Sequence, residues 1–380
     1  MQDQIVQARE IRSARIEGLR GVGSSGVLLG HLWGVSVLYS ARSYSTTFHR
    51  LILGAGFGAF VLLSLSGYLL SLPFLRRDFD DGSPVDLRRY ARNRVLRVFP
   101  LYYSATVIVL LLQQHGGTSG QWWRFLTFSE NFSHSTIAQV DGPMWTLVDE
   151  IHFYLLLPLI AWGLARLCRG RLSLAILALL ALTGASMAVY ELKYLSTAHK
   201  DTLWEYSTPA NFFYFTSGML VAATRIVLER RPAGWLGPVF GRADVWLLAG
   251  LGTWLWVCWK FEHFEVLALV SFFTIGALVF PLREGYLNRL FGWRPLVTLG
   301  LASYSLYLWH YPILTWLSGY HSLRPLGWLA LTGGVLSVIC ALISYRVIES
   351  PFLRMRRRWS PAAAGHTGSA ADAESARRRR

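Results

Sequence analysis

The sequence predicts an all-α fold: a polytopic integral-membrane bundle of about ten transmembrane helices with both termini in the cytoplasm. The composition supports this class, because 53% of the 380 residues are hydrophobic and only 16% are charged, with a mean hydropathy of +0.35. Such a chain is too apolar for an ordinary soluble domain. The apolar windows and the placement of the basic residues give two further arguments.

Ten windows are apolar and approach the roughly 20 residues that a transmembrane helix needs. The polar segment before the first window has no apolar core, so it does not read as a signal peptide. The third and seventh windows are the shortest, so the number of transmembrane helices is predicted to within about one helix. In order, the windows are residues 21–40, 51–72, 97–113, 145–165, 172–190, 209–227, 244–259, 264–282, 296–317 and 326–347.

The basic residues orient these windows. With the N-terminus inside, all but seven of the 37 Lys and Arg residues fall in cytoplasmic segments, as the positive-inside rule predicts. The formal net charge of +15 is spread over many helix ends. This dispersal argues against a nucleic-acid partner and favours membrane lipids or an anionic cytosolic ligand. The seven exceptions are Arg42, Arg50, Arg124, Lys193, Lys200, Lys260 and Arg324.

We expect one membrane domain with loose ends: a cytoplasmic segment at 1–20, the transmembrane domain at 21–352 and a disordered basic tail at 353–380. No internal repeat is visible, and no further domain is expected after the last window. The three cysteines fall in different windows, so we predict neither a disulfide framework nor a metal site.

The start of the first window contains Gly21-x-Gly23-x-x-Gly26, the spacing of a dinucleotide-binding loop. That motif requires a preceding strand and a soluble crossover unit, and neither is predicted here, so we interpret the match as chance. A ridge of Gly26, Gly30 and Gly34 offers a better explanation, because small residues four apart let a neighbouring helix approach closely.

Arg20 and His31 are eleven residues apart, which places them on one helix face about 16 Å apart along the axis, with Ser24 between them. Arg20 would lie at the cytoplasmic surface and His31 near the middle of the membrane. A histidine there can simply bond to another helix. Because ionisable groups are costly inside a membrane, we favour a functional role.

Six stretches together resemble the membrane-bound acyltransferase 3 family of bacterial O-acetylase-like enzymes. The first is the Arg20 and His31 pair. Two departures, Thr146 for a serine and Asp149 for an apolar or small residue, bear on acceptor specificity. The other five stretches occur in the family's order: SLSGY at 64–68, RNRVLRVFP at 92–100, MWTLVDEIHFYLLLP at 144–158, SYSLYLWHYP at 303–312 and VIESPF at 347–352.

The resemblance implies a multi-pass enzyme of the bacterial plasma membrane. It would move a short acyl group from acyl-CoA, a co-substrate rather than a permanently bound cofactor, to a hydroxyl of a carbohydrate, a glycolipid or a secondary metabolite such as a macrolide. A proton-coupled small-molecule exporter is the alternative, because it too would carry His and Glu in its spans. Paired halves with matching broken helices are absent, which weakens that alternative. A purely structural scaffold would leave the Arg20 and His31 stripe unexplained.

The expected site combines these residues. A histidine, with an ordinary pKa of about 6.5, can take the proton of a hydroxyl near neutral pH. The coenzyme A phosphates suit guanidinium forks at the cytoplasmic surface, where Arg94 and Arg97 share a helix face. The predicted catalytic residues are His31 and Glu150; those for acyl-CoA are Arg20, Arg94 and Arg97; those for the acceptor are Ser66, Trp145, Tyr154 and His310.

Three nearby ionisable residues receive simpler interpretations. Asp149 is expected to be solvated near the outer surface, and Glu349 to form a surface ion pair with Arg346 and Arg354. His152 is two residues from Glu150 and points elsewhere on the helix, so we predict no dyad between them.

Overall fold

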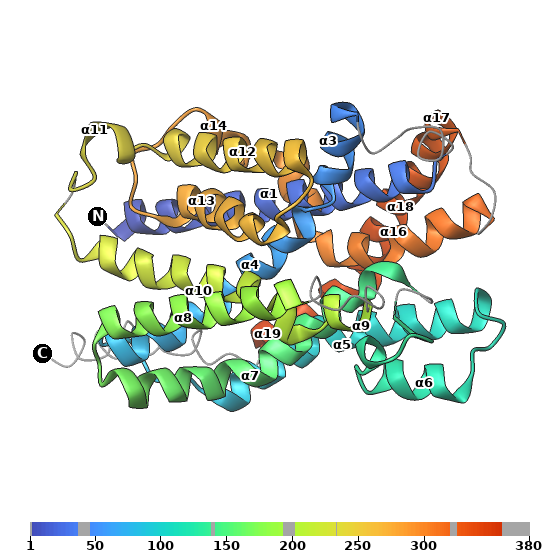
Figure 1. Cartoon of the computed structure of the whole chain (residues 1–380), viewed down its shortest axis with the longest axis horizontal. Coiled ribbons are helices and arrows are strands. Elements are labelled where there is room, and N and C mark those ends of the chain that lie inside the picture. The colour runs from blue at the N-terminus through green and yellow to red at the C-terminus, as the bar shows by residue number, and fades with distance from the viewer. Residues whose placement is uncertain are drawn as a thin grey trace, which may run out of the picture.

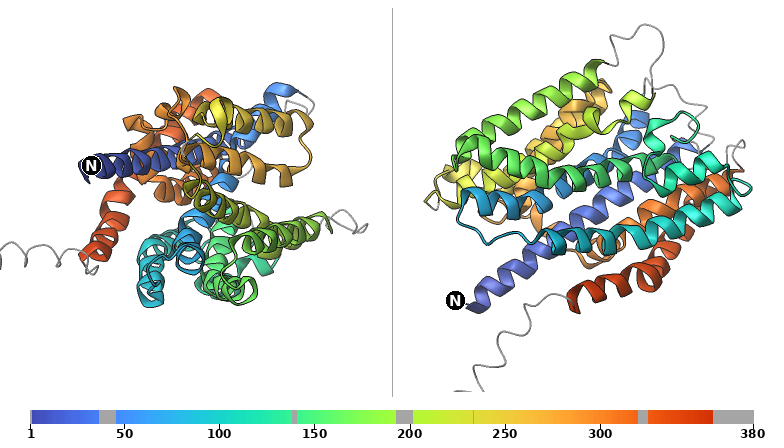
Figure 2. Two further views of the ribbon diagram at one scale, coloured as in Figure 1. Left: turned by 90° about the vertical axis from the view of Figure 1, so that its left-hand side faces the viewer. Right: turned by 90° about the horizontal axis from the view of Figure 1, so that it is seen from below.

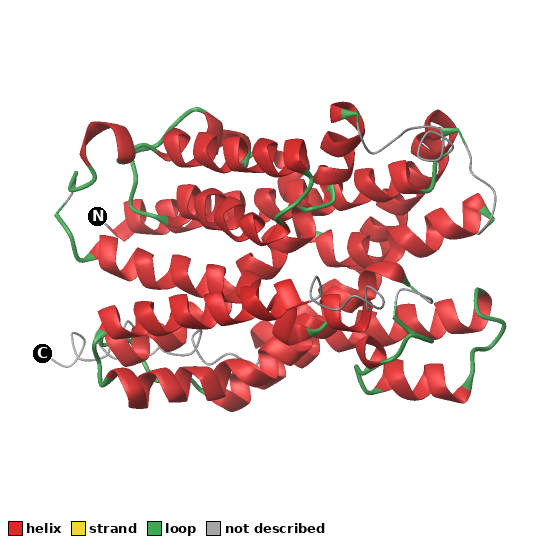
Figure 3. Ribbon diagram, in the orientation of Figure 1, coloured by secondary structure: helices red, strands yellow, loops and turns green. Residues whose placement is uncertain are grey.

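The computed structural model describes residues 2–36, 46–137, 141–192, 202–232, 234–319 and 325–358. This part of the chain forms helices and no strands (Figure 3). Most of the long helices run along the longest axis of the molecule (Figure 1). They are α1 (Gln2–Gly34), α4 (Gly58–Phe79), α5 (Leu87–Leu112), α7 (Trp145–Cys168), α8 (Leu172–Glu191), α10 (Thr208–Glu229), α12 (Ala243–Lys260), α13 (Leu267–Val279), α16 (Ser303–Ser318) and α18 (Val335–Ser344).

Shorter helices connect the long ones. Two π-helical segments, at Ala330–Gly334 and Tyr345–Glu349, flank α18 and extend it at both ends. The short helices are α3 (Thr47–Ala55), α6 (Ser119–Leu126), α9 (Thr202–Glu205), α11 (Gly237–Phe240), α14 (Leu287–Leu290), α15 (Arg294–Leu301), α17 (Leu326–Leu329) and α19 (Ser350–Arg358).

The protein is a multi-pass membrane protein. Six helical segments of the described chain are long and apolar enough to cross a membrane. The other four predicted windows also form helices, in α1, α12, α13 and α15 with α16, which are shorter or less apolar. The six segments are Thr47–Phe79, Leu87–Leu112, Gly142–Cys168, Leu172–Glu191, Leu203–Glu229 and Leu326–Arg356.

Both predicted ends continue helices of the bundle. Residues 2–20 of the predicted N-terminal segment belong to α1, which runs without a break into the first predicted window. Residues 353–358 of the expected disordered tail are helical in α19, and residues 359–380 lie outside the described residues. Helix α1 passes through the bundle and contacts α3, α4, α15 and α16 (Figure 2).

The glycines of α1 permit this central position. A Cβ on Gly21 would stand 2.1 Å from the backbone oxygen of Leu296, and one on Gly26 would stand 2.4 Å from that of Ala55. Backbones therefore touch along this face, as small residues allow. The predicted ridge is correct for Gly26 and Gly30 but wrong for Gly34, where no atom lies within 4 Å.

Helices α4 and α10 cross equally closely. A Cβ on Gly67 would lie 2.2 Å from the Phe215 oxygen, and one on Gly218 would lie 1.8 Å from the Ser64 oxygen. Close packing of α4 against α10 therefore explains why the SLSGY stretch has a glycine at this position.

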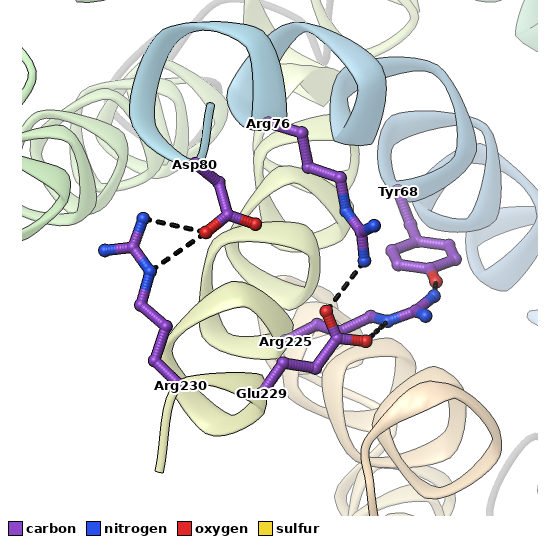
Figure 4. Close-up of polar contacts among 6 residues, drawn as sticks. All are labelled: Tyr68, Arg76, Asp80, Arg225, Glu229 and Arg230. Atoms are coloured by element: carbon purple, nitrogen blue, oxygen red, sulfur yellow. Dashed lines mark hydrogen bonds and ion pairs between the residues drawn. The ribbon is translucent and has the colours of Figure 1, made fainter. Parts of the chain in front are cut away.

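A polar network fastens the same two helices near their C-terminal ends (Figure 4). The carboxylate of Glu229 accepts from Arg76 of α4 and from Arg225, both at 2.7 Å. Arg225 also donates to the Tyr68 hydroxyl, and Arg230 pairs with Asp80 at 2.9 Å. The crossing that carries Ser66 is therefore held by packing and by charge.

Gly218→Ala is expected to lower the melting temperature in detergent, because the new methyl group collides with backbone that cannot rotate away. Overpacking of this kind costs about 1–3 kcal/mol or more. Gly163→Ala on α7 is the matched control, since no atom lies within 4 Å of that position, and it should cause no loss. Equal melting temperatures for both variants would contradict the close crossing.

Candidate active site

A cavity of about 110 Å³ opens among α1, α4, α5, α7 and α16. Its wall combines apolar side chains, most of them from α4, with charged and hydroxyl-bearing side chains. The lining residues are Arg20, Ala59, Leu62, Leu63, Ser66, Leu69, Leu70, Arg94, Arg97, Val98, Thr146, Leu147, Glu150, Tyr154, Ser303, Tyr304 and Tyr307. Sites of this type, apolar with a few convergent polar groups, are typical of ligand binding.

Six of the nine predicted site residues line this cavity: Arg20, Ser66, Arg94, Arg97, Glu150 and Tyr154. They come from four helices that are distant in the sequence. The Ser66 hydroxyl donates a hydrogen bond to the half-buried Glu150 carboxylate. The Glu150 carboxylate shares the wall of this cavity with three guanidinium groups, those of Arg20, Arg94 and Arg97. The serine of SLSGY and the glutamate of the fourth predicted window therefore line the same cavity and bond to each other.

Arg97 is held by Glu349, which corrects our expectation for that glutamate. Glu349 is only 2% exposed, and it accepts from Arg97 and, at 3.0 Å, from the Ser305 hydroxyl. The predicted surface pair with Arg346 and Arg354 is wrong, because the π-helical turn at Tyr345–Glu349 places this carboxylate inside the bundle. Two carboxylate oxygens with two donors make a fully paired buried charge.

Arg94 differs from the other two arginines, because it has no acidic partner among the described residues. Arg20 lies 3.7 Å from Glu17, and Arg97 is paired as above. The Arg94 guanidinium lies 5.6 Å from the centre of the Tyr154 ring, and its Nε is buried without an acceptor. Its charge is therefore available to an anion.

A second cavity, of about 190 Å³, meets the first at Arg94. Leu69, Leu70 and Arg94 line both, while Tyr90 and Asn93 from the first half of α5 line only the second. The two cavities therefore have a common wall, and Arg94 is the charged residue in it. The remaining lining residues of the second cavity are Pro73, Phe74 and Val85.

Sequence reasoning missed the tyrosines of α16. Tyr304 and Tyr307 line the cavity one turn apart, and the Tyr307 hydroxyl donates to the Pro143 oxygen at 2.9 Å and contacts the Thr146 hydroxyl. The three-residue spacing of these tyrosines inside SYSLYLWHYP predicts a shared helix face, and that signal could have found them. Thr146, noted only as a departure from the family pattern, also lines the cavity.

His31 and His310 form a pair outside the lining of this cavity. His310 Nε2 lies 3.1 Å from His31 Nδ1, across α1 and α16. The Tyr307 ring, which lines the cavity, has its centre 5.9 Å from that of His310. The pair thus lies one turn of α16 beyond the cavity wall, and the predicted roles of both histidines require a substrate group to reach past Tyr307.

Trp145 and His152 do not reach the cavity either. The Trp145 ring packs with its centre 4.7 Å from that of Tyr206, and its contact with the acceptor stays a prediction. His152 Nδ1 lies 2.7 Å from the Thr208 hydroxyl, and no contact with Glu150 is present. This agrees with the prediction that Glu150 and His152 do not form a dyad.

Asp149 belongs to a buried polar layer, so its predicted solvation is wrong. It is fully buried and accepts from Thr208 at 2.7 Å, with Asn131 at 3.5 Å. Nearby Glu130 lies outside the spans, where burial raises its pKa to about 8, and it contacts the Tyr102 hydroxyl at 2.9 Å. Among the described residues, no three His, Cys, Asp or Glu side chains are grouped to hold a metal ion.

Comparison with known proteins identifies the family of this chain. An acyltransferase domain, that of the acyltransferase 3 family, matches residues 13–346. Peptidoglycan O-acetyltransferase OatA of Listeria monocytogenes serovar 1/2a is 25% identical over 328 residues, which cover 78% of this chain and 51% of that protein. O-acetyltransferase OatA of Staphylococcus aureus strain NCTC 8325 is 22% identical over 373 residues, covering 88% of this chain and 56% of that protein.

A third relative, putative peptidoglycan O-acetyltransferase YrhL of Bacillus subtilis strain 168, is 25% identical over 331 residues, covering 78% of this chain and 50% of that protein. The chain spans about half the length of these curated relatives. No solved structure matches it significantly. Because the family domain covers most of the chain, including every residue that lines the two cavities, the chain belongs to the acyltransferase 3 family of membrane acyltransferases.

Proposed function

We propose that this protein transfers a short acyl group from acyl-CoA to a hydroxyl of an acceptor, with His31 as general base. The observation that carries the proposal is the cavity in which Arg20, Arg94, Ser66 and Glu150 converge. The cations in its wall suit the phosphates of a nucleotide thioester. The carboxylate in the same wall suits an acceptor that carries hydroxyl groups.

The proposed reaction balances without a further reactant. His31 Nε2 takes the proton of the acceptor hydroxyl while the hydroxyl oxygen attacks the acyl carbonyl carbon. The bond between that carbon and sulfur then breaks, and coenzyme A leaves as a thiolate that takes the proton back from His31. An ester and free coenzyme A are formed. Proximity of the bound reactants, rather than activation of an enzyme nucleophile, supplies most of the rate.

The donor is proposed to lie along α1 and α5. Its phosphates would contact Arg94 and Arg20, and its flexible arm would extend toward His31, about 16 Å further along α1 than Arg20. Tyr307 lines the cavity and its ring centre lies 5.9 Å from that of His310, so the thioester end of the donor is proposed to pass this ring on its way to His31. Glu150, bonded to Ser66, is proposed to bind an acceptor hydroxyl.

Arg94→Gln is expected to raise the Michaelis constant for acyl-CoA about 10- to 100-fold with a smaller effect on turnover, because a charge-assisted hydrogen bond contributes about 1.5–3 kcal/mol. Steady-state kinetics with varied acetyl-CoA measure this. Arg88→Gln is the matched control, since Arg88 lies on the same helix, is exposed and lines neither cavity. An unchanged Michaelis constant for acyl-CoA in folded Arg94→Gln protein would contradict a role in donor binding and leave Arg94 only a role in orienting the helix in the membrane.

The acceptor class is open to a direct test. Two of the relatives are named for peptidoglycan O-acetylation, the Listeria protein as a peptidoglycan O-acetyltransferase and the Bacillus protein as a putative one. Peptidoglycan fragments are therefore the first acceptors to assay, followed by glycolipids and a macrolide. Purified protein is incubated with acetyl-, propionyl- and butyryl-CoA, and free thiol release and acylated product are measured. Thiol release accompanied by an ester on one acceptor supports the proposal.

The exporter alternative receives no support from the comparisons, and the same experiment separates it. Absence of thiol release with every acyl-CoA, together with solute flux driven by a proton gradient in proteoliposomes, would replace the acyltransferase proposal with transport.

The proposed topology has ten spans with both termini in the cytoplasm of a bacterial cell. Ser83→Cys, between α4 and α5, should react with a thiol reagent only after the membrane is opened, whereas Ser119→Cys at the start of α6 should react in intact cells. The reason is the concentration of Lys and Arg on the side of Ser83. Labelling of Ser83→Cys in intact cells, or protection of Ser119→Cys, would overturn this orientation.

A further inference from the structure

We infer that His310 is a positioning residue, which together with the Val27 carbonyl oxygen holds His31 in the tautomer with the proton on Nδ1 and the lone pair on Nε2. The inference rests on the proposed function, in which His31 Nε2 is the base, and it assigns His310 a role different from the acceptor contact predicted from the sequence. It follows from hydrogen-bond chemistry at three nitrogen atoms.

The protonation of His310 is fixed by its own helix. His310 is 1% exposed, and its Nδ1 lies 3.0 Å from the backbone oxygen of Leu306. A carbonyl oxygen only accepts hydrogen bonds, so Nδ1 carries the proton. In a neutral ring the second nitrogen, Nε2, is then an acceptor, and this atom points at His31.

The His31 ring meets two acceptors at one nitrogen. Its Nδ1 lies 3.0 Å from the Val27 oxygen and 3.1 Å from His310 Nε2. A proton on Nδ1 can serve both, and the lone pair is then on Nε2. No described residue bonds to this Nε2, so its lone pair is left for a substrate hydroxyl.

The opposite tautomer is disfavoured by the same contacts. A lone pair on Nδ1 would face the lone pairs of Val27 O and of His310 Nε2, and it would leave both acceptors without a donor in a buried setting. When Nε2 takes the substrate proton, the resulting imidazolium keeps its Nδ1 proton between two acceptors. In other catalytic histidines, a hydrogen-bond partner on the second ring nitrogen fixes the tautomer and the ring orientation. His310 has the same role for His31.

Packing keeps the two rings in this geometry. Leu28 and Leu32 of α1 pack against Leu306 and Leu314 of α16 in a small apolar core around the pair. The Tyr311 ring meets the His31 ring edge-on, with centres 5.3 Å apart. Rotation of either histidine would require these helices to separate.

The first test is spectroscopic and needs no substrate. Protein labelled with ¹⁵N-histidine is examined by NMR in detergent or nanodiscs, and the His31 signals are assigned by their absence in His31→Gln. Protonated and unprotonated ring nitrogens have well-separated shifts. We expect Nε2 to be the unprotonated nitrogen of His31 in the wild type. In His310→Phe the Val27 oxygen is the acceptor left at Nδ1, and we expect a measurable population of the opposite tautomer. An unprotonated Nδ1 in the wild type, or an unchanged tautomer in His310→Phe, overturns the inference.

The second test is kinetic. His310→Phe retains a ring but no acceptor, and it should lower turnover about 10- to 100-fold, a part of the roughly 100- to 10,000-fold that general acid–base catalysis supplies, with the Michaelis constant for acyl-CoA unchanged. His310→Gln places an amide oxygen near the position of Nε2 and should recover most of that loss. Equal turnover in the Gln and Phe variants contradicts a positioning role.

These outcomes are separable from those of the proposed function. Full activity of His31→Gln would show that His31 is not the base. The NMR measurement of the wild-type tautomer would still test whether His310 holds the proton of His31 on Nδ1. The Gln variant and the wild-type spectrum also keep the inference testable where His310→Phe does not fold.

Discussion

His31→Gln is expected to lower acyl transfer by about 100- to 10,000-fold at saturating acyl-CoA and acceptor, the range that general acid–base catalysis contributes. A hydroxyl is a poor nucleophile until its proton is removed, and glutamine cannot take that proton. The Michaelis constant for acyl-CoA should stay close to the wild-type value, because the donor phosphates are assigned to Arg94 and Arg20. Steady-state kinetics of purified protein with a fixed acceptor measure both quantities.

His152→Gln is the matched control for this variant. His152 is a half-buried histidine that bonds to Thr208 and lines neither cavity. Its replacement should therefore leave turnover close to the wild-type value. Near wild-type turnover of His31→Gln would sink the base mechanism while leaving the family assignment intact.

Arg97→Met is expected to destabilise the protein by about 3–5 kcal/mol, because it leaves the Glu349 carboxylate buried without its cation. Glu349→Gln should also destabilise, since it leaves the Arg97 guanidinium without its anion. Replacing both residues removes the mismatch, so the Arg97→Met/Glu349→Gln double variant should recover much of the loss. Thermal unfolding of the four proteins in one detergent gives the coupling energy as a double-mutant cycle.

Two neighbouring arginines provide the controls. If Glu349 were paired at the surface, Arg346→Gln or Arg354→Gln would reproduce the loss seen with Arg97→Met; the buried geometry predicts that they do not. A coupling energy near zero would contradict the pair. The double variant also distinguishes the effect on stability from the effect on donor binding. It should regain stability, whereas any contact between Arg97 and the donor stays lost.

Several features were predictable because they depend on local sequence. Every predicted window contains helix in the structure, since hydropathy over about 20 residues decides whether a segment suits a membrane. Arg20 and His31 lie on one unbroken helix, as their spacing required. The close approach at Gly26 and Gly30 also follows from residue size alone.

The partners of the buried polar groups were not predictable in this way. Asp149 was expected in solvent and Glu349 at the surface, because each is adjacent in sequence to other polar residues. The structure instead pairs Glu349 with a residue 252 positions away and bonds Asp149 to Thr208 on a different helix. A buried charge needs a partner, and helix packing decides which partner is within reach.

By itself, the sequence determined that the chain is a membrane helical bundle and which stretches carry its chemistry, because hydropathy and helical periodicity are local properties. Only the tertiary structure decided that Arg94 is the cavity arginine without an acidic partner among the described residues, that Trp145 packs on Tyr206 outside the cavity, and that His31 meets His310. The last contact joins residues 279 positions apart. The physical reason is that hydrogen bonds and ion pairs act over about 3 Å, a distance fixed by how helices pack and not by their order in the chain.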